Sequence, residues 1–100
     1  MEAVESSLTR EREYKVFMFV DMVDSAAMKE NNVESFWLPQ IARFLDIVTE
    51  HVTAAGGTIV KYLGDGAMAV FERGHAPDAI NAALKIQEVL KNLAETKQYL

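Results

Sequence analysis

Hydrophobic and polar residues alternate along the chain in blocks that predict six secondary-structure elements. Residues 14–23 form the strongest predicted strand, because they are apolar at odd and even positions alike. Such a strand is typically covered on both sides. Asp24 and Ser25 follow it, and both residue types cap helices, so a short helix is predicted over residues 26–30.

A longer helix is predicted over residues 34–54. Its apolar positions recur at helical spacing and form one stripe, made of Ile41, Leu45, Val48 and Val52. Pro39 either kinks this helix or lies in its first turn. The pair Gly56-Gly57 ends it, because glycine accepts the left-handed conformation that follows many helices.

A β-hairpin and a final helix complete the pattern. Residues 58–63 and 67–71 are two β-forming runs joined by a Gly-Asp-Gly turn at residues 64–66, a strong short-range hairpin signal. Pro77 suits the first turn of the last helix. One face of that helix carries Ala79, Ala83, Ile86, Leu90 and Leu93.

The order strand–helix–helix–strand–strand–helix predicts an α/β fold, more narrowly an α+β fold of the ferredoxin-like or palm type, built on an incomplete split βαβ unit. A right-handed crossover makes the first two strands parallel, and the hairpin makes the third antiparallel. Asp21 and Asp65 then lie at one edge of the sheet, and they are neighbours if the third strand lies beside the first. Lys61 is predicted to share a face with Ile59 and Leu63.

Composition narrows the class of protein. One hundred residues, half of them hydrophobic and a quarter charged, predict one small domain at residues 14–100 after a lead-in segment at residues 1–13. The net charge of −5 argues against a nucleic-acid surface. The absence of cysteine excludes disulfides and thiolate sites. With no signal peptide and no membrane-spanning run, a cytoplasmic location is expected.

Two adjacent carboxylates indicate a cation. Oxygen ligands suit Mg²⁺ or Mn²⁺, and the Met22 carbonyl offers another oxygen. Ser25 and Ala26, at the start of a helix, offer backbone N–H groups to a phosphate. Together they indicate nucleoside-triphosphate chemistry. Simpler interpretations stay open: Asp65 as an ordinary turn residue, and Lys61 as an edge-strand lysine that deters aggregation.

Three segments of this chain resemble the class III adenylate/guanylate cyclases. Residues 17–25 (FMFVDMVDS) resemble the first strand and metal motif of that family, and residues 56–71 (GGTIVKYLGDGAMAVF) its second metal motif. Residues 78–87 (DAINAALKIQ) are similar to the helix that follows. The resemblance covers nearly the whole chain after residue 13.

The resemblance implies that Asp21 and Asp65 bind two Mg²⁺ or Mn²⁺ ions with help from the Met22 carbonyl. Lys61 matches the base-selecting position, which implies ATP as substrate and cyclic AMP as product. The implied nucleotide-binding residues are Val23, Asp24, Ser25, Ala26, Lys61 and Gly64. Family members work as head-to-tail dimers, in which one protomer supplies the aspartates and the other the base-selecting lysine.

The chain also departs from the family. It has Asp24 where glycine is usual and Ala26 where threonine is usual. It ends at Leu100, before the strands that carry a second base contact and an asparagine–arginine pair in the family. The physical argument reaches the same gap, because the most apolar strand would be a sheet edge. We therefore expect an excised fragment, a chain completed by a partner, or a naturally shortened protein.

Three functions follow. The first is the metal- and ATP-binding half of an adenylate cyclase, inactive alone and active when completed by the missing half or a partner; its expected assembly is a homodimer or a complex with a completing chain. The second is an inactive dimerisation or regulatory module of the same fold. The third is a diguanylate cyclase, which ranks lower because the Gly-Gly-Asp-Glu-Phe motif is absent.

Overall fold

The computed structural model describes residues 14–23 and 25–95. The lead-in predicted at residues 1–13 and the predicted cap residue Asp24 lie outside these residues. The elements follow the predicted order, and they are β1 (Lys15–Asp21), α2 (Ser25–Asn31), α3 (Glu34–Ala54), β2 (Thr58–Tyr62), β3 (Gly66–Glu72) and α4 (Ala76–Glu95).

The three strands form one sheet in the order β1-β3-β2, and both neighbouring pairs are antiparallel. Strands β1 and β2 therefore run in the same direction with β3 between them. This is the split βαβ arrangement expected from the sequence, and the α+β class is confirmed. It places the C-terminal end of β1 and the β2–β3 turn at the same end of the strands.

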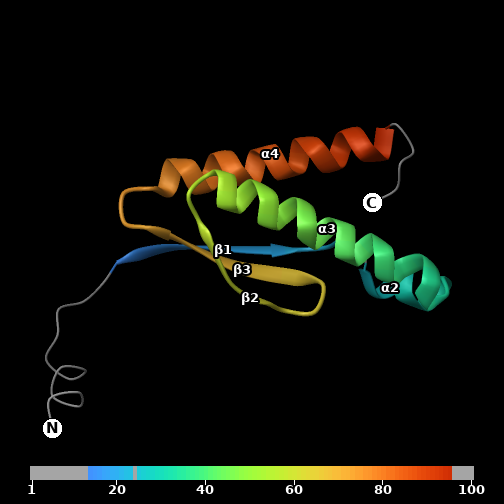
Figure 1. The fold of residues 1–100 in the computed structure, drawn as a ribbon. Helices are drawn as coiled ribbons and strands as arrows, with labels where there is room; N and C mark the ends of the chain where they lie inside the picture. Colours follow the sequence, from blue (N-terminus) through green and yellow to red (C-terminus); the bar gives the residue numbers. More distant parts are fainter. Residues whose placement is uncertain (1–13, 24, 96–100) are drawn as a thin grey trace, which may run out of the picture.

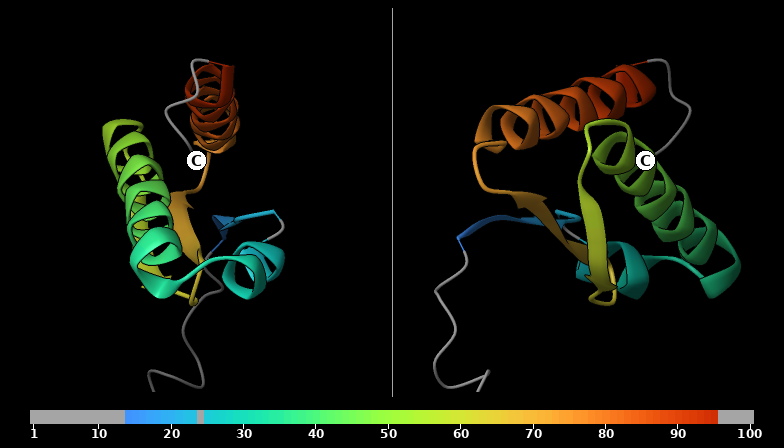
Figure 2. Two further views of the ribbon diagram at one scale, coloured as in Figure 1. Left: turned by 90° about the vertical axis from the view of Figure 1, so that its right-hand side faces the viewer. Right: turned by 60° about the vertical axis from the view of Figure 1, so that its left-hand side comes forward.

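The core lies between the sheet and two helices. Figure 1 shows α3 and α4 on the same side of the sheet, and Figure 2 shows them side by side in two further views. The central strand β3 is the most buried, because both neighbouring strands and both helices surround it. The buried core residues are Phe44, Val48, Val52, Ala67, Ala69, Phe71, Ala79, Ala82 and Ile86.

The apolar stripes of both helices behave nearly as predicted. In α3, Ile41, Val48 and Val52 are buried, and Pro39 lies inside the helix, beyond its first turn. Pro77 is the second residue of α4. Within the described part of the chain, no helix is long and apolar enough to cross a membrane.

The opposite face of the sheet differs from the expectation. Strand β1 was expected to be covered on both sides, but α3 and α4 cover only the side that carries Val16, Met18 and Val20. On the other side, Phe17 and Phe19 are 57% and 68% exposed. We refer to this side as the open face.

Strand β2 contains a β-bulge that the sequence did not reveal. Ile59 pairs with Ala69, whereas Lys61 pairs with Met68, so the residue between them is extra. An extra residue reverses the alternation of side chains along a strand. The prediction that Lys61 shares a face with Ile59 is therefore wrong: Lys61 lies with Met68 on the open face.

Candidate functional site

The β2–β3 turn is tighter than predicted, because it ends one residue earlier. Leu63 and Gly66 exchange two backbone hydrogen bonds, of 2.8 and 3.1 Å, so the loop consists of Gly64 and Asp65. Gly64 has a φ of 66°, the left-handed conformation that glycine adopts without steric cost. Gly66 is the first residue of β3 rather than part of the loop. The turn therefore places Asp65 at the tip of the hairpin.

Gly66 allows β1 to approach the hairpin closely. It pairs with Asp21, and a Cβ atom at this position would lie 2.6 Å from the Val20 carbonyl oxygen and 3.0 Å from Asp21 Oδ1. Any side chain here would push the carboxylate of Asp21 away. The absence of a side chain at residue 66 thus sets the position of the Asp21 carboxylate.

The structure brings Asp21 and Asp65 together, as the sheet order predicted. The backbone N–H of Met22 donates a 3.2 Å hydrogen bond to the carbonyl oxygen of Asp65. Both aspartates line one hollow of about 350 Å³, together with Phe19, Leu63 and other residues at this end of the sheet. Two carboxylates from distant parts of the sequence therefore face a shared space.

Asp65 is held by residues of α2. The Ser25 hydroxyl donates a hydrogen bond to Asp65 Oδ2, and the Lys29 ammonium lies 4.0 Å from the same oxygen. The Ser25 hydrogen bond lowers the pKa of Asp65 below its ordinary value of 3.8; burial opposes this effect, and a backbone hydrogen bond and Lys29 add to it. The lowered pKa favours the ionised form of the Asp65 carboxyl.

Lys29 is the site residue that sequence analysis missed. It lies four residues after Ser25, so both side chains project from the same face of α2. Its ammonium also lies 5.3 Å from the centre of the Trp37 ring on α3, within the range of a cation–π interaction. The four-residue spacing was the available signal. This spacing points to the site only because the structure places α2 beside the hairpin.

The other predicted site residues lie on several different elements. Val23 is 85% exposed just beyond β1, and Ala26 is exposed in the first turn of α2. Gly64 precedes Asp65 in the loop. Lys61 is exposed on the open face, where it pairs with Met68, two strands from β1. One chain therefore gathers the acidic positions but holds Lys61 apart from them.

The donor set suits a metal bound partly by a ligand. Among the described residues, no group of three or more His, Cys, Asp or Glu side chains gathers to form a complete protein site. Mg²⁺, however, is commonly held by one or two carboxylates and completed by substrate phosphates and water. Asp21, Asp65 and the Met22 carbonyl are oxygen donors of this kind, so the residues fit Mg²⁺ or Mn²⁺ with a phosphate-bearing ligand.

The chain is similar to known proteins in three-dimensional structure. No family profile matches the chain, and no curated protein matches it. A bacterial light-regulated adenylyl cyclase is 28% identical with a TM-score of 0.81, over 89% of this chain and 27% of its own. The adenylyl cyclase CyaB from P. aeruginosa is 21% identical with a TM-score of 0.74, over 84% of this chain and 46% of its own.

A third similar structure is the dimeric guanylyl cyclase domain of the RhoGC fusion protein from the aquatic fungus Blastocladiella emersonii. It is 21% identical with a TM-score of 0.68, and the match covers 81% of this chain and 49% of that one. The chain thus spans less than half the length of each of these structures.

Proposed function

The chain has the fold of class III nucleotidyl cyclase domains, and from that premise we propose that it is the metal- and ATP-binding half of an adenylate cyclase. The reaction would convert ATP to cyclic AMP and pyrophosphate. The observation that carries the proposal is the convergence of Asp21 and Asp65 on one hollow at the end of the sheet. The similarity to two adenylyl cyclases supports the cyclisation of ATP as the proposed reaction.

Asp21 and Asp65 would hold two Mg²⁺ or Mn²⁺ ions, with the Met22 carbonyl as a further ligand. When bound, the ions would activate the attacking hydroxyl and neutralise the leaving pyrophosphate. Asp65 would bind a metal in its ionised form, because Ser25 keeps its pKa low. Before a metal binds, the positive charge of Lys29 near Asp65 reduces repulsion between the two carboxylates.

Residues on either side of the aspartates would bind the nucleotide. Residues 23–26 adjoin Asp21 and would approach the triphosphate, with Gly64 on the hairpin side. Lys61 would select adenine. Because the chain keeps Lys61 apart from Asp21 and Asp65, we propose a head-to-tail homodimer in which a second copy, or a completing partner, supplies this lysine.

The test is calorimetric titration of the full chain with ATP in the presence of Mn²⁺. We expect binding that requires the metal and is abolished by Asp21→Asn and by Asp65→Asn. Asp46→Asn is the matched control, since Asp46 is an exposed acid on α3, far along the chain from the site. Lys61→Glu should weaken ATP binding relative to GTP. If the chain binds neither Mn²⁺ nor ATP, the proposal is wrong.

A second candidate is a catalytically inactive dimerisation or regulatory module of the same fold. Lys29 favours it, because an ammonium 4.0 Å from Asp65 Oδ2 already provides a positive charge near that carboxylate. Ala26 lacks the hydroxyl that is usual in the family. This module would form a dimer whose sedimentation does not change with ATP or metal. Stronger Mn²⁺ binding by Lys29→Met would show that the lysine competes with the ion.

A further inference from the structure

The outer edge of β1 carries backbone hydrogen-bonding groups that face away from the sheet. Met22 donates its N–H to Asp65 on the hairpin side, and N–H and C=O groups alternate in direction along a strand. Even-numbered residues of β1 therefore point these groups toward β3, whereas Phe17 and Phe19 point theirs outward. Within the described residues, no strand lies on that side of β1.

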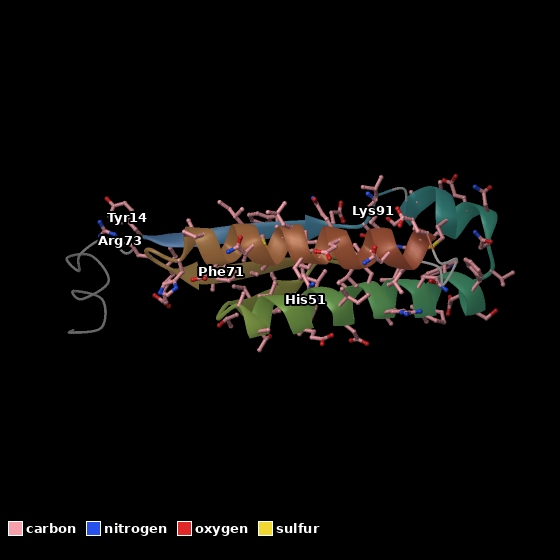
Figure 3. The ribbon with its side chains drawn as sticks, turned by 90° about the horizontal axis from the view of Figure 1, so that it is seen from above. Tyr14, His51, Phe71, Arg73 and Lys91 are labelled. Atoms are coloured by element: carbon pink, nitrogen blue, oxygen red, sulfur yellow. The ribbon has the colours of Figure 1, made fainter. Side chains whose placement is uncertain are left out.

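An apolar groove runs beside this edge. It has a volume of about 430 Å³ and lies between β1 and α4, with Met18, Val20, Ile86 and Leu90 among its lining residues. Figure 3 shows α4 lying along β1, with α3 on the far side of α4 from that strand.

The apolar surface continues from the groove around α4. Ile80 and Leu84, one helical turn apart, are 59% and 58% exposed. We refer to the groove, these two side chains and the outer edge of β1 together as the β1 edge surface.

The sequence of β1 is complementary to itself in an antiparallel pair. With two copies of Lys15–Asp21 centred on Met18, Phe17 of one copy faces Phe19 of the other, and Lys15 faces Asp21. Aromatic and opposite-charge pairs across strands are both favourable. Lys15 also forms a 2.9 Å ion pair with Glu72, which holds its ammonium at this end of the sheet.

This register also meets the hydrogen-bonding requirement. Pairing Phe17 with Phe19 joins residues whose backbone groups both face outward, while Met18 faces its own copy at a position without backbone hydrogen bonds. Side chains opposite one another lie on the same face of a sheet. The helices of both copies would thus lie on one side, with the exposed Ile80 and Leu84 of each α4 near the twofold axis.

We propose that two copies of this chain associate through their β1 edge surfaces to form a continuous six-stranded antiparallel dimer with Met18 on the twofold axis. A second copy is favoured as the occupant over an unrelated strand, because β1 carries the partner charges for its own Lys15 and Asp21 at matching positions. Asp21 belongs both to this interface and to the proposed metal site, but association through β1 does not depend on nucleotide binding.

The test uses the fact that the chain contains no cysteine. In the proposed register, two Met18→Cys residues would have Cα atoms about 4.5 Å apart, which a disulfide can bridge. Two Val20→Cys residues would be about 13 Å apart, because each is displaced two residues from the axis. On mild oxidation we expect Met18→Cys to form the linked dimer about a hundredfold faster than Val20→Cys. Equal rates would overturn the proposed register.

Sedimentation of the unmodified chain provides the independent measurement. We expect a species of twice the 11.2 kDa chain mass without nucleotide. Phe19→Pro removes an outward N–H while keeping the β1–β3 hydrogen bonds, so it should raise the dimer dissociation constant about tenfold or more. Phe19→Ala, which keeps that N–H, is the control for loss of the ring. A monomer, or a dimer that is unaffected by Phe19→Pro, would overturn the proposal, whatever the chain does with ATP.

Discussion

The pKa of Asp65 depends on residues that are distant in the sequence. The hairpin places it at a turn, but a hydroxyl and an ammonium from α2 lower its pKa. An isolated turn aspartate would titrate near its ordinary pKa. The short helix therefore favours the ionised form of this turn residue.

Replacing Ser25 by alanine should raise the pKa of Asp65 toward 3.8, since the Ser25 hydrogen bond is the largest cause of its lowering. A lowered folded-state pKa stabilises the protein above the unfolded-state pKa, and this stabilisation is lost as the pH falls through the folded-state value. Ser25→Ala should therefore cost about 1 kcal/mol of unfolding free energy at neutral pH. The difference from the wild type should shrink below pH 3.8.

The measurement is carboxyl NMR titration together with urea denaturation at several pH values. Ser25→Thr retains the hydroxyl and serves as the control. If Ser25→Ala leaves the Asp65 titration unchanged, the hydrogen bond does not lower the pKa of this carboxyl group.

Gly66→Ala should destabilise the fold by about 1–3 kcal/mol, because the new methyl group would collide with the Val20 carbonyl oxygen and crowd the Asp21 carboxylate. The same change should weaken Mn²⁺ binding by displacing Asp21. Gly74→Ala is the matched control: it has open space around it but a φ of 89°, so it tests backbone strain alone. Equal losses of metal binding in the two variants would contradict the steric role of Gly66.

The sequence predicted most elements but not their finer geometry. Apolar periodicity identified α3 and α4, and the Gly-Asp-Gly segment identified the hairpin. The convergence of Asp21 with Asp65 followed from strand order alone. The bulge in β2 did not follow, because Lys61 is flanked by β-forming residues on both sides and no glycine marks the extra residue. Lys29 was also missed, since nothing local shows that α2 packs beside the hairpin.

Deletion of Val60 tests the bulge at the scale of an element. Removing the extra residue would leave Ile59 opposite Ala69 and Lys61 opposite Met68, so Lys61 would stay on the open face and Tyr62 would keep its 2.7 Å hydrogen bond to Thr49 on α3. We expect the free energy of unfolding to change by less than about 1 kcal/mol, because the deletion removes an unpaired residue and leaves the other side chains on their faces. Val60→Ala, which keeps the bulge, is the control for loss of the side chain. The measurement is urea denaturation, and a loss of about 2 kcal/mol or more, as expected when a deletion reverses the faces of a strand without a bulge, would contradict the bulge.

At the scale of the whole molecule, the described residues form a three-stranded sheet with helices on one side, and this sheet leaves the open face and the β1 edge surface as apolar surfaces. The open face carries Asp21, Lys61 and the exposed Phe17 and Phe19. The edge carries outward backbone groups beside an apolar groove. A chain of this size buries only part of its apolar surface alone. Both surfaces are therefore suited to protein partners.

Mixing two defective chains separates a shared nucleotide site from a site within one chain. In a head-to-tail dimer, Asp21→Asn lacks a metal ligand and Lys61→Glu lacks the adenine contact, so neither dimer contains an intact site. In an equal mixture, half the dimers pair one chain of each kind, and each such dimer regains one intact site of its two. Calorimetry with ATP and Mn²⁺ should then recover about a quarter of the wild-type high-affinity sites. If Lys61 acted in the same chain as Asp21, mixing would recover none, because every site would retain one of the two defects.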